Sequence, residues 1–322
     1  MSTPLVSIII PVHNAGRWLA ETLESALVQT WPAREIIVVD DHSTDGSREL
    51  AQSFASRGVQ VLTHPNRGAS AARNAGLNAA RGELIKFLDA DDLLSPEALS
   101  LQITALAEKP GCIAFGSWAR FYDHPASAVF IPHPGWHDGS GLDWIKETWR
   151  DTEPMYQCGL FLIPRELLLQ CGGWNEELSL IDDFEFFTRL VLGSAGLVFT
   201  PTARLYYRSG LAGSLSGRKS RRAWESAALS TRLATDHLLD KENTPDTRRL
   251  AANMLQSLVY QMYPLQRDLV AGLEARIAEL GGGDIAPRGG RSFRILQGLI
   301  GWKAARHLQI AAGKFPLHQT EA

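Results

Sequence analysis

The sequence predicts an α/β protein built around a mainly parallel sheet, on two observations from its first hundred residues. Short uninterrupted runs of β-branched residues are typical of strands buried on both faces. These runs alternate with segments whose apolar residues recur every three or four positions, and such alternation implies right-handed crossovers between parallel strands. The expected strands cover residues 6–11, 35–41, 59–63 and 84–88.

Helices are expected after each of the first three strands. The first contains Leu19 and Leu23 at helical spacing, and the next two cover residues 45–56 and 70–80, with Gly82 ending the third. In a parallel sheet the carboxyl ends of the strands meet at one edge, where ligands bind. The polar residues that follow the strands are therefore expected to lie together.

Two polar segments are assigned to helix caps. One of Ser43, Thr44 or Asp45 could cap the second helix. A fourth helix would open at Ser95 and Pro96, with serine at the cap and proline at the first helical position.

The chain beyond residue 110 has a less regular pattern. Residues 112–165 are interpreted as short strands and long loops, followed by an amphipathic helix at 182–192. Short strands are expected at 160–163, 198–200 and 205–207, and helices at 221–239, 246–263, 265–280 and 291–314.

These patterns suggest two regions. Residues 1–217 form the expected α/β region, with a regular first half, 1–110, and a less regular second half, 111–217. Residues 218–322 form a helical C-terminal extension.

Composition excludes several classes of protein. The formal net charge of −3 offers no overall basic surface for nucleic acid. The three cysteines form no C-x-x-C pair, which favours a reduced, cytoplasmic setting over a disulfide scaffold. The first apolar run is too short for a signal peptide, and no stretch approaches the roughly 20 apolar residues that span a bilayer.

The strongest chemical signal is the run Asp89-Ala90-Asp91-Asp92 at the end of an expected strand. Clustered carboxylates raise each other's pKa unless a cation is present, and Mg²⁺ or Mn²⁺ takes oxygen ligands together with substrate phosphates. The alternative is capping or simple solvation. Because Ser95 is expected to supply the cap, a metal site is the preferred interpretation.

Three other positions carry alternatives. Asp41 would be free to accept hydrogen bonds from a base or ribose if a neighbouring residue caps the helix. Arg73 could reach a phosphate or could be a solvated arginine on an ordinary helix. Asp182 and Asp183 could stabilise a helix N-terminus through its dipole, or one of them could be a general base for a sugar hydroxyl.

Taken together, the segments over residues 5–215 resemble family 2 glycosyltransferases. The resemblance implies the GT-A fold, inversion at the anomeric carbon, a nucleotide-diphosphate sugar donor (commonly a UDP-sugar) and Mg²⁺ or Mn²⁺. The segments that carry it are Pro11-Val12-His13-Asn14, Val39-Asp40-Asp41-His42-Ser43-Thr44-Asp45, Asp89-Ala90-Asp91-Asp92, Gly172-Gly173-Trp174-Asn175-Glu176 and Asp182-Asp183.

The resemblance also implies that residues 1–217 are a catalytic domain, in which 1–110 bind the nucleotide and 111–217 bind the acceptor. It further implies a role for each matching position. The nucleobase and donor would contact Pro11, His13, Asn14, Asp41, Arg73, Asp89 and Ala90. Asp91 would bind the metal with Asp89, Asp183 would be the base, and Trp174 and Asp182 would line the acceptor site.

Some positions depart from the family pattern or rest on a looser match. Many relatives have an aromatic residue at the place of His13, and a glutamate at the place of Asp182. Arg208 and Lys219 border a Gly- and Ser-rich stretch that resembles a loop closing over a pyrophosphate, which makes them candidate phosphate ligands.

The last helical segment, 291–314, is basic and lacks acids. It suits a helix on an anionic membrane surface, or one packed on the catalytic domain with its basic face in solvent. Contact with the inner face of a membrane would fit a lipid-linked acceptor. The expected role is in the synthesis of a glycan, a polysaccharide or a glycolipid.

Two other functions remain open. A nucleotidylyltransferase would need a Gly-rich basic loop for a triphosphate, and residues 11–17 match that poorly. A non-catalytic sugar-binding protein of the same fold would not need Asp183 beside Asp89 and Asp91.

Overall fold

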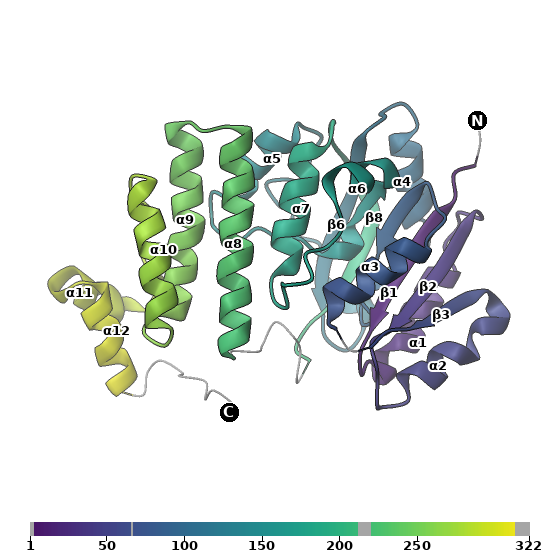
Figure 1. The fold of residues 1–322 in the computed structure, drawn as a ribbon, viewed down its shortest axis with the longest axis horizontal. Coiled ribbons are helices and arrows are strands. Elements are labelled where there is room, and N and C mark those ends of the chain that lie inside the picture. Colours follow the sequence, from purple (N-terminus) through teal and green to yellow (C-terminus); the bar gives the residue numbers. More distant parts are fainter. Residues whose placement is uncertain (1–2, 66, 212–219, 313–322) are drawn as a thin grey trace.

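The computed structural model describes residues 3–65, 67–211 and 220–312. Within them, one eight-stranded sheet has helices on its faces, and a row of further helices extends from one side (Figure 1). The strand order is β3-β2-β1-β4-β7-β6-β8-β5.

The first four strands form the parallel part of the sheet, as predicted. β1 pairs in parallel with both β2 and β4, and β2 pairs with β3. Their bounds are β1 (Val6–Val12), β2 (Arg34–Asp40), β3 (Val59–Thr63) and β4 (Leu84–Phe87). The helices between them are α1 (Gly16–Leu27), α2 (Ser47–Ser53) and α3 (Ala69–Ala79).

Two helix ends differ from the prediction. The second helix is shorter than 45–56, because Gly46, at a φ of 86°, turns the chain before it and a 3₁₀ turn at Ala55–Arg57 follows it. Asp45 nevertheless accepts a hydrogen bond from the Ser47 amide at 3.0 Å. The third helix ends before Gly82, whose role is close packing: a Cβ there would lie 2.5 Å from the Ser7 hydroxyl.

The expected cap at Ser95 is wrong. The fourth helix, α4 (Ala98–Leu106), has Glu97 at its N-cap without a side-chain cap bond. Ser95 follows an unpredicted strand, β5 (Leu93–Leu94), and its hydroxyl accepts a hydrogen bond from the Arg204 amide at 3.0 Å. Ser95 therefore does not relieve the acids at 89–92 of a capping role.

The second half of the sheet is mixed. β7 (Phe161–Pro164) runs antiparallel to β4 and to β6 (Cys112–Phe121), and β6 runs parallel to β8 (Gly196–Arg208). The strands expected at 198–200 and 205–207 are parts of β8, joined across a register shift at Gly116. One short helix, α5 (Gly141–Thr148), lies where only strands and loops were expected. Another, α6 (Arg165–Cys171), lies in a segment for which no element was predicted.

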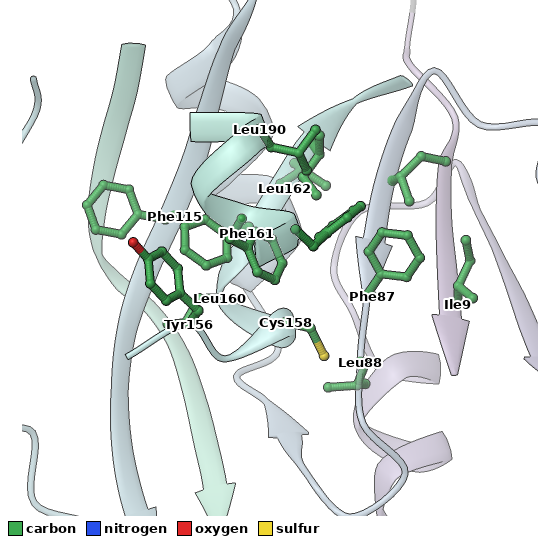
Figure 2. Packing of buried hydrophobic residues seen from close by; sticks show 14 of the residues in the cluster. Ile9, Phe87, Leu88, Phe115, Tyr156, Cys158, Leu160, Phe161, Leu162 and Leu190 are labelled. Atoms are coloured by element: carbon green, nitrogen blue, oxygen red, sulfur yellow. The ribbon is translucent and has the colours of Figure 1, made fainter. Parts of the chain in front are cut away.

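The main core lies between the sheet and its helices. Phe87 from β4, Phe115 from β6 and Phe161 from β7 pack with Leu190 of α7 (Asp182–Gly193) (Figure 2). The rings of Phe161 and Phe187 stack at 4.3 Å. Because one core spans both halves of the sheet, the two halves form a single packed unit.

The C-terminal helices continue the row that begins at α7, with α8 beside α7, then α9 and α10, and α11 and α12 beyond them (Figure 1). They are α8 (Arg221–Lys241), α9 (Pro245–Met262), α10 (Arg267–Glu279), α11 (Arg291–Ile300) and α12 (Trp302–Ala311). Ala234 and Leu238 of α8 join the main core, while Leu255, Val259 and Val270 belong to a second, smaller core. The proposed boundary at residue 217 lies outside the described residues, so the division into domains stays a prediction.

The segment expected as one helix over 291–314 is two helices. Gly301 separates α11 from α12 at a φ of 78°, and residues 313 and 314 lie outside the described chain. Among the described helices, none combines the length and apolar character needed to cross a membrane.

Candidate active site

The carboxyl ends of β1, β2 and β4 meet at one edge of the sheet, as the strand order requires. The Asp41 amide donates to the Val12 carbonyl at 2.7 Å, and the Leu88 amide donates to the Ile9 carbonyl at 2.9 Å. The segments that follow the three strands are therefore neighbours. The predicted convergence of residues 11–14, 40–41 and 89–92 is confirmed.

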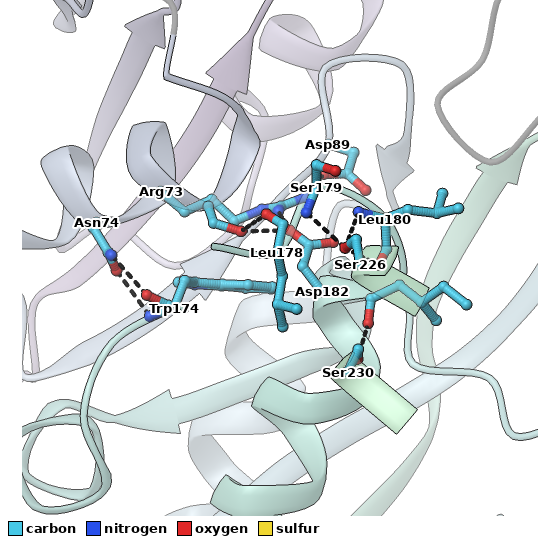
Figure 3. A network of polar contacts seen from close by, with 12 residues as sticks. Arg73, Asn74, Asp89, Trp174, Leu178, Ser179, Leu180, Asp182, Ser226 and Ser230 are labelled. Carbon is cyan, nitrogen blue, oxygen red and sulfur yellow. Dashed lines mark hydrogen bonds and ion pairs between the residues drawn. The ribbon is translucent and has the colours of Figure 1, made fainter. Parts of the chain in front are cut away.

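Arg73 of α3 connects two carboxylates at this edge (Figure 3). Its guanidinium donates to Asp89 and to Asp182, both at 2.8 Å. Ser70, one turn earlier, donates to the same oxygen of Asp182 at 2.9 Å. Arg73 is 7% exposed, so the alternative of a solvated arginine is wrong.

The guanidinium of Arg73 lies over the ring of Trp174. The guanidinium carbon is 4.3 Å from the ring centroid, and the ring of Phe186 stacks on Trp174 at 3.8 Å. Trp174 is 3% exposed, which leaves no open aromatic face for a sugar acceptor. The ring supports Arg73, a cation–π arrangement that favours the buried cation.

A second arginine, which the sequence analysis missed, arranges the loop before Trp174. Arg189 of α7 donates to the carbonyls of Gly172 and Gly173 at 3.0 and 2.8 Å. The buried carboxylate of Glu185 accepts from Arg189 at 2.7 Å and lies 3.0 Å from His237 of α8. The i, i+4 spacing of Glu185 and Arg189 was the available signal for this pair.

The first turn of α7 carries the candidate base. Asp183 is partly buried, and burial together with the charge of Asp182 raises its pKa to about 8. The preceding Ile181 has a φ of 57°, which is rare for a β-branched residue and indicates backbone strain of about 1–3 kcal/mol. Ser230 of α8 donates to the Ile181 carbonyl at 2.5 Å and so stabilises this turn (Figure 3).

The three acids after β4 have different surroundings. Asp89 pairs with Arg73, as described above. No other described residue donates a hydrogen bond to the carboxylate of Asp91, and burial with the nearby charge of Asp89 raises its pKa to about 6. Asp92 is fully buried and accepts from the Arg208 amide at 2.9 Å, while burial and its acidic neighbours raise its pKa well above the usual range.

A divalent ion would have to be shared with substrate. Among the described residues, no group of three or more acid, histidine or cysteine side chains is placed to hold a metal. Mg²⁺ commonly binds through one or two carboxylates plus substrate phosphates, which is what Asp91 and Asp89 offer.

The expected nucleobase site is already ordered by internal bonds. Asp41 accepts from the amides of Arg67 and Gly68 at 3.0 and 2.9 Å and lies 2.9 Å from His64. Asp41 is 3% exposed, so the expectation that its carboxylate is free is wrong. The Arg67 and Gly68 amides already donate the hydrogen bonds that the Asp41 carboxylate was expected to accept from a nucleobase or ribose.

The other residues expected at the donor site differ in their exposure to solvent. His13 and Asn14 are exposed, Pro11 is partly exposed, and Ala90 is buried. The side-chain oxygen of Asn14 accepts from the Thr44 amide at 2.8 Å, which joins the turns after β1 and β2.

The two candidate phosphate ligands have different outcomes. Arg208 is 2% exposed and donates through Nη2 to Glu21 at 2.6 Å. Only its Nη1 lacks a partner within the described chain. Lys219 lies outside the described residues. Both phosphate roles stay predictions.

Comparison with known proteins identifies the family. Residues 7–170, just over half of the chain, match the family model for Glycosyl transferase family 2. The chain belongs to this family.

Curated relatives match the N-terminal part of this family 2 chain. GlyG of Streptococcus pneumoniae, a glycosyltransferase, is 33% identical over 129 residues, covering 39% of this chain and 43% of GlyG. TuaG of Bacillus subtilis, a putative teichuronic acid biosynthesis glycosyltransferase, is 37% identical over 119 residues, covering 36% and 47%. These matches span less than half of the relatives' own lengths.

Solved structures extend the likeness to nearly the whole chain. S. aureus TarS 1-349 in complex with UDP-GlcNAc has a TM-score of 0.70 at 16% identity, covering 97% of this chain and 93% of that one. Its complex with UDP has a TM-score of 0.65 at 16% identity, covering 99% and 94%. At this identity the likeness shows the fold alone, and it confirms the GT-A fold predicted for this family 2 chain.

Proposed function

We propose that the protein transfers a sugar from a nucleoside diphosphate donor, most simply a UDP-sugar, to a hydroxyl acceptor. One arrangement carries this proposal: Arg73 joins Asp89, at the expected donor carboxylates, to Asp182, the neighbour of the candidate base. Family membership and the UDP-GlcNAc bound by the TarS structure support the same class of donor.

The donor carboxylates fit a divalent cation. The raised pKa of Asp91 reflects a partly buried charge beside Asp89 without a compensating cation of its own. A bound Mg²⁺ or Mn²⁺ would neutralise charge on the leaving diphosphate. Asp91 would be the principal protein ligand, with Asp89 shared between the ion and Arg73.

Asp183 is proposed to remove the proton from the attacking acceptor hydroxyl. The hydroxyl oxygen would then bond to the anomeric carbon as the bond to the diphosphate oxygen breaks, which inverts the anomeric centre in one step. A base with a pKa near the working pH suits such a proton transfer, and the pKa of Asp183 is raised to about 8. Asp182 is proposed to act beside it by fixing Arg73 and bordering the acceptor.

The nucleotide is proposed to lie over the turns after β1 and β2. His13 and Asn14 are exposed there and could contact the base. Asp41 would act mainly by fixing the amides of the turn at Gly68. Release of UDP rather than GDP from a panel of nucleotide sugars, in the presence of Mn²⁺, tests the donor class.

The same panel separates the competing functions. A nucleotidylyltransferase would consume a nucleoside triphosphate and release pyrophosphate, and a non-catalytic sugar-binding protein would release nothing. Release of a nucleoside diphosphate that increases with added acceptor supports the proposed transfer. Absence of any release from every donor, with or without a glycan acceptor, would contradict it.

A glycan or lipid-linked acceptor is proposed, with peripheral contact between α11 and an anionic membrane. Ile295 and Leu299, one turn apart, are 57% and 77% exposed. Arg291 and Arg294 precede them on the same helix, and neither arginine has an acidic partner among the described residues. A basic helix with exposed aliphatic residues suits the inner face of a membrane.

The contacts of the neighbouring helix α12 leave Ile295 and Leu299 of α11 exposed. Trp302 of α12 lies against Tyr260 of α9 and against Tyr263, which directly follows α9, at ring distances of 4.8 and 5.0 Å. The alternative of a docked segment is therefore compatible with an outer face that contacts lipid.

Vesicle co-sedimentation tests the contact. The Ile295→Asn/Leu299→Asn variant should lose binding to vesicles containing phosphatidylglycerol, while Val129→Asn, at another exposed aliphatic residue, should keep it. Equal binding by all three proteins would contradict the membrane contact without affecting the transferase proposal.

A further inference from the structure

The turn that carries the three acids is fixed through its backbone. The Asp92 amide donates to the Asp89 carbonyl at 3.2 Å, which closes the turn. The hydroxyl of Thr22, on α1, donates to the Ala90 carbonyl at 2.9 Å in a buried position. Two successive carbonyls are thus held before any ligand binds.

Arg208 holds the third carbonyl. Its Nε donates to the Asp91 carbonyl at 2.9 Å, and its backbone amide donates to the Asp92 carboxylate at 2.9 Å. Its Nη2 donates to Glu21 of α1 at 2.6 Å. Every backbone carbonyl from residue 89 to residue 91 therefore has a hydrogen-bond donor.

The position of Arg208 follows from the sheet. β5 pairs antiparallel with β8 in the register Leu93 to Tyr206, so continuing that register by two residues places Arg208 opposite Asp91. The guanidinium carbon lies 4.3 Å from the ring centroid of Trp18 and 4.5 Å from that of Phe121. These rings exclude water and leave the cation few alternative positions.

We propose that Glu21, Arg208 and Asp92 form a brace that sets the direction of the Asp91 carboxylate before a divalent cation binds. This inference rests on the proposed function, in which Asp91 is the principal metal ligand. Arg208 is then a positioning residue, and Asp92 acts through its hydrogen bond to Arg208 rather than as a metal ligand. Groups that orient metal ligands commonly change metal affinity by about 10–100-fold when removed.

Glu21 offers the cleanest variant of the brace. Its side chain is 55% exposed, so Glu21→Ala should fold while removing the carboxylate that accepts from Nη2 of Arg208. Glu24→Ala is the matched control, because Glu24 lies on the same helix and forms its ion pair with Arg57 rather than with Arg208.

The measurement is the dissociation constant of Mn²⁺ in the presence of UDP, read from the electron paramagnetic resonance signal of free Mn²⁺. Glu21→Ala should weaken Mn²⁺ binding about tenfold, whereas Glu24→Ala should match the wild-type protein. Thermal melting of each variant checks that the fold is kept.

A pair of substitutions at Asp92 separates positioning from metal ligation. Asp92→Asn keeps an oxygen that can accept from the Arg208 amide, so Mn²⁺ affinity should stay within about threefold of wild type. Asp92→Ala removes that acceptor and should weaken binding about tenfold.

Two results would overturn the brace alone: normal wild-type Mn²⁺ binding with no effect of Glu21→Ala, or an equal loss in Asp92→Asn and Asp92→Ala. Failure of the wild-type protein to bind Mn²⁺ with UDP would instead overturn the metal assignment, and the brace with it.

Discussion

Arg73 and Asp182 are 109 residues apart in the sequence and form an ion pair of 2.8 Å. Because Arg73 also pairs with Asp89, a single buried cation neutralises one carboxylate from each side of the candidate site. Removing one member of a buried charge network leaves its partners uncompensated. Substitution of Arg73 or of Asp182 should therefore change the charge balance of the candidate site.

Arg73→Met should destabilise the protein by about 3–5 kcal/mol, because it leaves Asp89 and Asp182 without their cation. Urea denaturation measures this change. Arg57→Met is the control, since Arg57 and Glu24 are both nearly half exposed, and such surface pairs contribute about 0–1 kcal/mol. Equal effects of the two substitutions would contradict a structural role for Arg73.

Asp182→Asn should extend activity to lower pH. The pKa of Asp183 is raised to about 8 by burial and by the charge of Asp182, and the base form exists above that pKa. In the wild-type protein kcat/KM should therefore fall as pH decreases below about 8. Without the Asp182 charge the pKa of Asp183 decreases, and the fall should begin at lower pH.

The pH profile of kcat/KM for both proteins provides the measurement. A profile that keeps its wild-type position in Asp182→Asn would argue against Asp183 as the titrating base.

Asp183→Asn should abolish transfer while donor binding is largely kept, because the amide cannot accept the acceptor proton. Transfer assays and calorimetric titration with UDP measure the two properties separately. Full transferase activity in this variant would rule out the base assignment.

The same variant should be more stable than the wild-type protein at pH 8 and should unfold at a higher Tm, because it carries no buried charge at this position. The folded-state pKa of Asp183 is raised above its unfolded value of 3.8. The folded state then binds more protons, so this group's contribution to stability declines as pH rises from about 4 through 8. A Tm difference between variant and wild type that does not grow over that range would contradict the raised pKa.

Asp91→Ala should weaken metal-dependent nucleotide binding by at least tenfold. UDP affinity with and without Mn²⁺ gives the measurement, and EDTA-treated wild-type protein gives the reference. Identical UDP affinity with and without Mn²⁺ in the wild-type protein would count against a metal at this position.

The elements that could be predicted are those whose own residue pattern identifies them without knowledge of distant contacts. β1 and β2 are largely buried and rich in β-branched residues, and β4 is buried along its whole length. Both the strands and their parallel order could therefore be predicted. α5 and α6 were missed because each has only a turn or two of helix, too short for helical periodicity to emerge. β5 consists of two residues, and its existence depends on pairing with β8 far along the chain.

The candidate site shows the same division. The acids at 89–92 could be placed at the sheet edge because a strand ends there. The burial of Trp174 and the bonds to Asp41 depend on residues distant in sequence, such as Phe186 and Gly68. Single-sequence patterns carry no information on such contacts.

The turn before the candidate base depends on a helix far from it in sequence. Ser226 of α8 accepts from the amides of Ser179 and Leu180 at 2.8 and 2.9 Å, and Ser230 donates to Ile181 (Figure 3). The family match ends at residue 170. A chain trimmed to the matched segment would keep the carboxylates proposed for the donor and lose both the proposed base and its support, so a minimal catalytic fragment must extend at least through α8.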